Sequence, residues 1–309
     1  MLAILANPEL WVLTVAMGIP IAYGALGGMF SERGGTVNIA IEGMMLTSAF
    51  FAVVFAHATG NAWLGLLGGM ASAVLMAVLL YWAAVPLMAD HVVVGMAVDL
   101  LALGLTGYLL VTMYGYNGTP INTPSLPTWH LPWLSGIPVI GPALAEQSVL
   151  AYLLIPVLIA SWYALFRTPW GLRLRSVGEN PHIARSAGLS VRGLKLSGVL
   201  LSGALAGVAG AYLSIGVLNS FSADMSDGRG YIALAALIFG NWRPGGATLA
   251  ALLFGFATAL SIQLQGTAIS HNLVLMLPYL LTVVAVAGII GRTTPPAADG
   301  LPYREEEEY

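Results

Sequence analysis

The chain has 309 residues, of which 58% are hydrophobic and 8% are charged. An ordinary soluble domain carries about 25% charged residues, so this composition excludes a soluble globular protein. The formal net charge of -3 reflects mainly a run of glutamates near the end of the chain, and we expect no nucleic-acid partner. The absence of cysteine excludes disulfides and thiolate metal sites, and the dispersed histidines favour no metal site either.

Eight apolar windows are long enough to cross a membrane as helices. They cover residues 9–30, 36–57, 62–85, 92–115, 148–166, 196–217, 246–264 and 271–290. A further apolar segment, 230–240, rises only about 16 Å as a helix and cannot cross a core about 30 Å thick, so it is a half-helix or broken span. We therefore predict an all-α, polytopic transmembrane helical bundle of about nine segments, forming one domain over residues 1–294.

The cations indicate how this bundle is oriented. Lys and Arg are absent from residues 34–166, and six of the eleven then fall within residues 167–195. The positive-inside rule places this loop in the cytoplasm, so alternating segments put the N-terminus outside and the C-terminus inside. Residues 117–147 then form an external loop, and residues 295–309 form a solvated, acidic cytoplasmic tail. Arg229 is the exception, at the outer end.

The same topology predicts an internal repeat. If the fifth span separates two groups of four segments, the groups begin on opposite sides of the membrane. Inverted repeats of this kind are common in transporters, with the substrate passing between the halves.

The stretch SERGGTVNIAIEGMM places Asn38 and Glu42 at the start of an apolar span, directly after Gly34 and Gly35. Glycine permits a break in the helix, and residues four apart share one helical face. Asn38 and Glu42 are therefore candidates to line a polar path. Alternatively, Glu42 caps or pairs with a neighbouring helix and holds the break rigid, and the two roles are compatible.

Two further polar positions are candidates for the path. Asp99 lies in the middle of GMAVDLLALGL, where an unpaired carboxylate is costly and must face the bundle interior or become protonated. Asn219 begins a polar cluster that includes Asp224 and Asp227 and precedes the short segment. This cluster either gates the external mouth or is an ordinary solvated loop.

The basic loop contains a helix start signal. Asn180 and Pro181 favour a short helix from His182 to Ala187 that ends near Gly188. Nothing in the membrane-embedded part of the chain requires this short helix. The loop either contacts a cytoplasmic partner or rests on anionic lipid headgroups.

Three stretches, FSERGGTVNIAIEGMM, GENPHIARSAGLSV and GRGYIALAALIFGNWRPGG, resemble the inner-membrane permeases of ATP-binding cassette (ABC) importers for simple sugars and nucleosides, of the branched-chain amino acid and ribose type. The closest likeness is to purine nucleoside permeases that work with a basic-membrane-protein type lipoprotein. The resemblance puts Asn38 and Glu42 at a broken helix beside the path. At position 99 such permeases more often carry Asn, so Asp99 is a departure. The coupling helix that contacts the ATPase would contain Glu179, Asn180, Pro181, Ala184, Arg185 and Gly188.

The resemblance also implies the partners: an ABC ATPase subunit, a second related permease in a heterodimer, an external substrate-binding lipoprotein and membrane lipid, all at the cytoplasmic membrane of a prokaryote. The single lysine, Lys195, follows Leu194 rather than Gly, so the chain has no phosphate-binding Walker A loop. We expect no cofactor in this chain, because ATP and Mg²⁺ would bind the partner ATPase.

The expected cargo is a neutral polar solute, most specifically a purine nucleoside, with a ribose-like sugar as the alternative. A less favoured alternative is a secondary transporter driven by protons through Glu42 and Asp99. An intramembrane enzyme is disfavoured, because the HExxH motif and the glycine spacing of GxSG serine proteases are both absent.

Overall fold

The computed structural model describes residues 7–265, apart from 116–117, 120–122, 133, 135 and 138–140, together with 276, 280 and 293–304. The elements in chain order are α2 (Pro8–Arg33), α3 (Ile41–Thr59), α4 (Ala62–Ala84), α5 (His91–Tyr114), β1 (Thr128–His130), α6 (Gly141–Ala145), β2 (Glu146–Ser148), α7 (Val149–Arg167), α8 (Pro169–Glu179), α9 (Pro181–Ser186), α10 (Val191–Ala211), the π-helix η1 (Tyr212–Leu218), α11 (Arg229–Phe239) and α12 (Pro244–Leu264).

Within these described residues, seven helical segments are long and apolar enough to cross a membrane, the sixth being α10 continued by η1. This confirms the predicted all-α membrane bundle. The short segment predicted at 230–240 is α11, a helix of 11 residues. The predicted span 271–290 lies outside the described residues, apart from two isolated positions, and the inverted repeat stays a prediction.

Capping side chains set where several helices begin. Asn61 Oδ1 accepts a hydrogen bond from the Trp63 N–H at 2.8 Å, at the start of α4. Asp90 Oδ1 accepts one from the Val92 N–H at 2.8 Å, at the start of α5. Such side chains satisfy N–H groups that have no partner inside the helix, which fixes the turns between consecutive spans.

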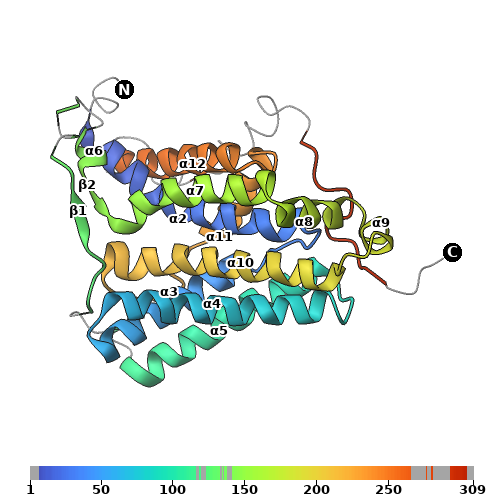
Figure 1. The fold of residues 1–309 in the computed structure, drawn as a ribbon. Coiled ribbons are helices and arrows are strands. Elements are labelled where there is room, and N and C mark those ends of the chain that lie inside the picture. The colour runs from blue at the N-terminus through green and yellow to red at the C-terminus, as the bar shows by residue number, and fades with distance from the viewer. Residues whose placement is uncertain are drawn as a thin grey trace.

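The long helices lie side by side along a common direction, with β1, α6 and β2 at one end of the bundle and α8 and α9 at the other (Figure 1). The basic loop and the segment expected outside are therefore at opposite ends, as alternating spans require. Helices α2 and α10 contact each other in the interior, whereas α5 and α7 expose most of their apolar surface. Which end faces the cytoplasm stays a prediction.

The interior helices approach closely because small residues line their contacts. A Cβ added to Gly65 on α4 would lie 2.7 Å from the Ala52 carbonyl oxygen on α3, and one added to Gly207 on α10 would lie 2.7 Å from Met70 Cα on α4. Side chains there would push the helices apart.

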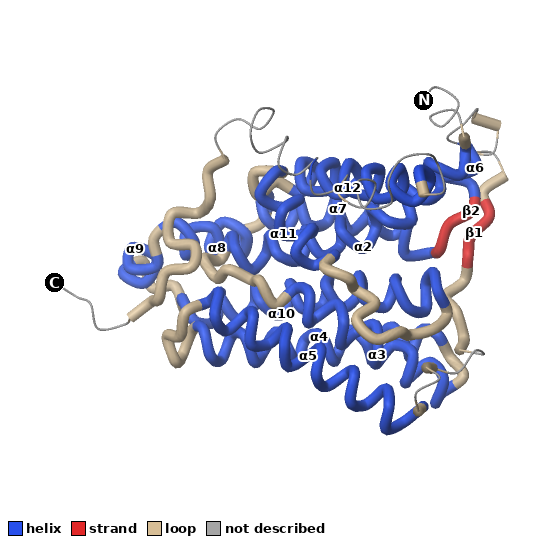
Figure 2. The backbone as a smooth tube through the Cα atoms, turned by 180° about the vertical axis from the view of Figure 1, so that it is seen from behind, coloured by secondary structure: helices blue, strands red, loops and turns tan. Residues whose placement is uncertain are grey.

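Helix α11 begins inside the bundle. It lies beside α2 and α12 (Figure 2) and ends near Trp242, whose carbonyl oxygen accepts a 2.9 Å hydrogen bond from Arg33 at the end of α2. The first residue of α11, Arg229, follows Gly228, whose N–H donates a hydrogen bond to Glu42 at the start of α3. The expectation that Arg229 lies at the outer end stays a prediction.

Candidate functional site

Helix α3 also begins inside the bundle, because residues 34–40 follow α2 without forming a helix. Gly35 has a φ of +76°, and a Cβ there would lie 3.2 Å from the Ala298 carbonyl oxygen and 3.3 Å from Lys195 Nζ. Both the left-handed backbone and the crowding require glycine at this position. The predicted helix break is therefore confirmed, and it delivers Asn38 and Glu42 to the interior.

Asn38 is fully buried and bonds to a helix far along the chain. Its Nδ2 donates a 2.7 Å hydrogen bond to Ser202 Oγ on α10. A buried amide needs such a partner, because an unpaired polar group in an apolar interior costs about 1–3 kcal/mol. Asn38 thus ties the non-helical segment before α3 to α10.

Glu42 joins the starts of the two helices that begin inside the bundle. Its Oε1 accepts a hydrogen bond from the Gly228 N–H at 2.9 Å, and its Oε2 accepts one from the Gly230 N–H at 2.6 Å. The carboxylate lies in the first turn of α3 and at the start of α11, where both helix dipoles favour a negative charge. Glu42 therefore caps α11, as the alternative interpretation predicted, while its role beside a path stays a prediction.

Asp99 reaches the same region from α5 and is buried. Its Oδ1 accepts a hydrogen bond from the Gly43 N–H at 2.7 Å, and its Oδ2 accepts one from the Tyr231 hydroxyl at 2.8 Å. Each interior carboxylate thus binds the backbone at the start of a broken helix. Together, Glu42, Asp99 and Tyr231 form what we call the interior polar cluster, whereas Asn38 bonds to Ser202.

Asn219 does not belong to this cluster. It has a φ of +53°, is exposed, and follows the last residue of η1. Of the four predicted path residues, the structure therefore brings together Glu42 and Asp99, whereas Asn38 bonds to Ser202 on α10 and Asn219 lies apart.

Sequence reasoning missed Tyr231 and Ser202, which complete these hydrogen bonds. Tyr231 stands directly after Gly230 at the start of the short apolar segment, and its 46% exposure leaves part of its ring uncovered. A polar aromatic residue beginning a half-helix was the available signal. Its partner on α5 lies 132 residues away, and no local pattern identifies it.

The predicted coupling residues form a compact helical turn at the end of the bundle. Asn180 Oδ1 accepts hydrogen bonds from the His182 and Ile183 N–H groups, each at 3.1 Å, and Pro181 is the first residue of α9. Gly188, with a φ of +81°, follows shortly after the helix ends. The predicted short helix is therefore confirmed, with α9 beginning one residue earlier than expected.

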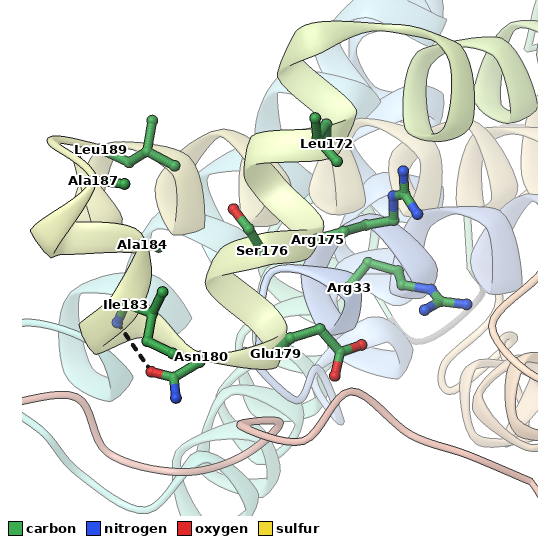
Figure 3. A pocket seen from close by; sticks show the side chains of 10 residues that line it. All are labelled: Arg33, Leu172, Arg175, Ser176, Glu179, Asn180, Ile183, Ala184, Ala187 and Leu189. Atoms are coloured by element: carbon green, nitrogen blue, oxygen red, sulfur yellow. Dashed lines mark hydrogen bonds between the residues drawn. The ribbon is translucent and has the colours of Figure 1, made fainter.

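A cavity of about 450 Å³ opens between α8 and α9. It is lined by Arg33, Leu172, Arg175, Ser176, Glu179, Asn180, Ile183, Ala184, Ala187 and Leu189. Figure 3 shows Ile183 and Leu189 on the α9 side, with Arg33 and Arg175 on the opposite side. The Arg175 guanidinium lies 4.9 Å from the centre of the Phe166 ring, which holds this cation beside the cavity. A partner loop with an apolar tip and an acidic flank would complement this shape.

Residues 11–286 match the family of permease components of branched-chain amino acid transport systems. The chain belongs to this family. The permease is 42% identical over 295 residues to a nucleoside ABC transporter permease of Lactococcus lactis subsp. cremoris, covering 92% of this chain and 93% of the relative. It is 40% identical over 302 residues to a guanosine ABC transporter permease of Bacillus subtilis, covering 94% of each. A permease of Haloferax volcanii that its name assigns to glucose is 31% identical over 261 residues, or 83% of this chain and 78% of that one.

The interior polar cluster and α9 both lie within the matched residues. The permease therefore combines a membrane bundle with a polar interior site and a separate short helical turn at one end of the bundle. The two most similar relatives reported above are named as permease proteins of ABC transporters.

Proposed function

We propose that this permease imports purine nucleosides as a transmembrane subunit of an ATP-driven importer. The observation that carries the proposal is the 42% and 40% identity to permeases for nucleosides and guanosine, over more than nine-tenths of each chain. The family match over residues 11–286 includes the residues that form the interior polar cluster.

The interior polar cluster supports a neutral, hydrogen-bonding cargo. Carboxylate and amide oxygens accept hydrogen bonds from ribose hydroxyls, and the apolar helices around them suit a purine base. In the present state Glu42 and Asp99 bind the backbone N–H groups of Gly230 and Gly43. A movement of α11 away from α3 and α5 frees the Glu42 carboxylate and the Asp99 oxygen that binds Tyr231, so the same residues close the path and line it. Asn219 lines the external entrance.

Energy comes from the ATPase, which binds ATP and Mg²⁺ and contacts Glu179 at the end of α8, the capping residue Asn180 and Arg185 on α9. These three side chains belong to exposed residues at the end of the bundle. The importer contains a second, related permease and an external lipoprotein that delivers the cargo. The chain itself hydrolyses no ATP. It resides in the cytoplasmic membrane of a prokaryote, with its N-terminus outside and its C-terminus inside.

Glucose is the second candidate cargo, favoured by the 31% identity to the Haloferax volcanii permease. That relative is more distant and is matched over less of its length than either nucleoside relative. Sugar hydroxyls would bind the same carboxylates. A sugar has no base, however, so the apolar helices around the carboxylates would have no apolar part of the cargo to contact.

Uptake by the reconstituted complex tests the proposal. The permease, its partner permease, the ATPase and the binding lipoprotein are placed in proteoliposomes, and uptake of radiolabelled guanosine is measured with ATP. We expect ATP-dependent uptake that continues when a protonophore collapses the proton gradient, and that excess guanosine inhibits more strongly than excess glucose or ribose. Uptake that stops with the gradient would establish the proton-driven alternative, and stronger competition by a sugar would overturn the nucleoside assignment.

A further inference from the structure

Residues 293–304, which we call the strap, pack along the α8 and α9 end of the bundle instead of remaining solvated. The Ala298 N–H donates a 2.9 Å hydrogen bond to the Gly178 carbonyl oxygen near the end of α8. The Thr294 N–H donates a 2.9 Å hydrogen bond to Asn241 Oδ1, in the turn between α11 and α12. The expectation of a solvated tail is therefore wrong for residues 295–304, while residues 305–309 lie outside the described residues.

Tyr303 fixes the strap to the coupling region. Its side chain is 4% exposed and packs with Val177 on α8, Ala184 on α9 and Val191 on α10. Its ring centre also lies 5.4 Å from that of His182 on α9. Tyr303 thus contacts α9 and belongs to a small buried cluster that joins three successive helices.

Helix α9 depends on this contact for its position. It has six residues, all of them described, and Ala184 alone among them is buried. Isolated helices shorter than about 12–15 residues are marginal in water, so α9 is held by what packs on it. Ala184 packs in the small cluster around Tyr303, which makes the strap one of its principal supports.

The other side of the strap touches the segment that leads into the broken helix. The Asp299 carboxylate interacts electrostatically with Lys195, whose Nζ donates a 2.7 Å hydrogen bond to the Gly35 carbonyl oxygen. A Cβ added to Gly300 would lie 3.2 Å from Val37 Cγ2. Lys195 is 2% exposed, so these contacts are enclosed and rigid.

We propose that the strap joins α9 to the segment before α3, with Tyr303 and Asp299 as positioning residues that transmit movement of the coupling helix to the interior polar cluster. The connection runs from α9 to Tyr303, along the strap backbone to Asp299, and from there through Lys195 to Gly35. From Gly35 the backbone leads within seven residues to Glu42. This inference rests on the proposed function, since it assigns the strap a part in coupling ATP hydrolysis to transport.

Tyr303→Ala tests the strap, and Tyr303→Phe is its matched control. The Tyr303 hydroxyl has no hydrogen-bond partner in the described structure, so the phenylalanine ring keeps all the packing. The complete importer is reconstituted, and guanosine transported per ATP hydrolysed is measured for each variant. We expect Tyr303→Ala to lower this ratio about 2- to 30-fold, the range found for mutations along coupling networks, and Tyr303→Phe to keep it. An unchanged ratio in Tyr303→Ala would overturn the inference.

A second measurement applies if Tyr303→Ala fails to reach the membrane. Cysteines replacing Glu179 and Ala297, whose Oε2 and N atoms are 3.3 Å apart, are joined by a short bifunctional reagent in the cysteine-free chain. Since Glu179 is a proposed ATPase contact, the ratio of the double-cysteine importer is first measured without the reagent. Because the strap and the end of α8 move as one unit, cross-linking should then leave that ratio unchanged. Loss of transport on cross-linking would contradict the inference. Uptake of guanosine by the wild-type importer tests the proposed function separately. If the wild-type importer fails to transport guanosine, the proposed function is overturned, and not the inference about the strap.

Discussion

The Asp99 carboxylate on α5 accepts a 2.8 Å hydrogen bond from the Tyr231 hydroxyl on α11. This contact ties an outer helix to a half-helix that begins inside the bundle. Because the same carboxylate also accepts the Gly43 N–H, Asp99 holds the starts of α3 and α11 together.

Removing the Tyr231 hydroxyl should weaken this link. We expect Tyr231→Phe to lower the free energy of unfolding by about 1 kcal/mol, the usual net value of one hydrogen bond. Thermal unfolding in detergent measures the change, with Tyr108→Phe as control because Tyr108 is 69% exposed on α5. In an Asp99→Ala background the effect of Tyr231→Phe should largely disappear, and full additivity would contradict the link.

Glu42 should be more sensitive than Tyr231, because two backbone N–H groups depend on its carboxylate. Glu42→Ala leaves both N–H groups unpaired in the interior, at about 1–3 kcal/mol for each, so we expect a large fall in melting temperature and loss of transport. Glu42→Gln keeps one acceptor oxygen and should be milder. Glu146→Gln, at the exposed first position of strand β2, is the matched control and should change neither measurement.

The Asn180 cap should matter for coupling more than for overall stability. Asn180→Ala removes the acceptor of two N–H groups of α9 and should cost about 1 kcal/mol locally. We expect transport per ATP hydrolysed to fall while the melting temperature barely changes. Asn180→Asp retains a capping oxygen and should restore the ratio, and equal loss in both variants would show that the amide itself contacts the ATPase.

Attachment of the strap should depend on pH. Burial raises the pKa of the Asp299 carboxyl from its ordinary value of 3.8 to about 7, and the Lys195 ammonium opposes that shift. Glu32, at the end of α2, is the other charged group that interacts with Asp299. Since the Asp299 carboxyl has a higher pKa when the strap is docked than when it is released, docking binds a proton. The stabilisation of the docked strap that comes from this proton is complete below the pKa of Asp299 in the released strap. It is lost as pH rises through about 7.

Hydrogen exchange of residues 296–304 measures this dependence after correction for intrinsic rates. Protection should be greater at pH 6 than at pH 8 in the wild-type protein. Asp299→Asn cannot ionise, so protection should become independent of pH. A pH dependence that survives in Asp299→Asn would assign the effect to another group.

Single cysteines test the membrane orientation, because the natural chain has none. Cysteines replacing Trp129 on β1 and Ser186 on α9 occupy exposed positions at opposite ends of the bundle. In intact cells a membrane-impermeant thiol reagent should label the first and spare the second. Labelling of both would mean that the ends do not face opposite sides.

Local signals explain which features could be predicted. Apolar windows located the spans, and Asn180 with Pro181 located α9, because capping and helix length depend on neighbouring residues. The broken start of α3 was also visible from Gly34 and Gly35. These are properties of short segments of chain.

The contacts that complete the site depend on residues far apart in sequence. Lys195 was counted as one cation of a basic loop, yet it is buried and donates to Gly35, 160 residues away. The strap resembled an ordinary solvated tail because its buried residues, Pro296, Ala298 and Tyr303, form no apolar pattern. Which side chain meets which backbone is decided by how the helices pack, and no single segment contains that information.

The hydrogen bond between Gly230 and Glu42 also constrains how the protein is made. The two residues are 188 positions apart, so at about 5–20 residues per second Glu42 is synthesised on the order of 10–40 s before its partner. An unpaired carboxylate in lipid is costly, so the second span must wait at the membrane surface or beside the insertion machinery during that interval. The Glu42 carboxylate then takes its place in the bundle only when α11 is complete. A ribosome stalled before Gly230 would therefore leave the first half of the bundle unfinished.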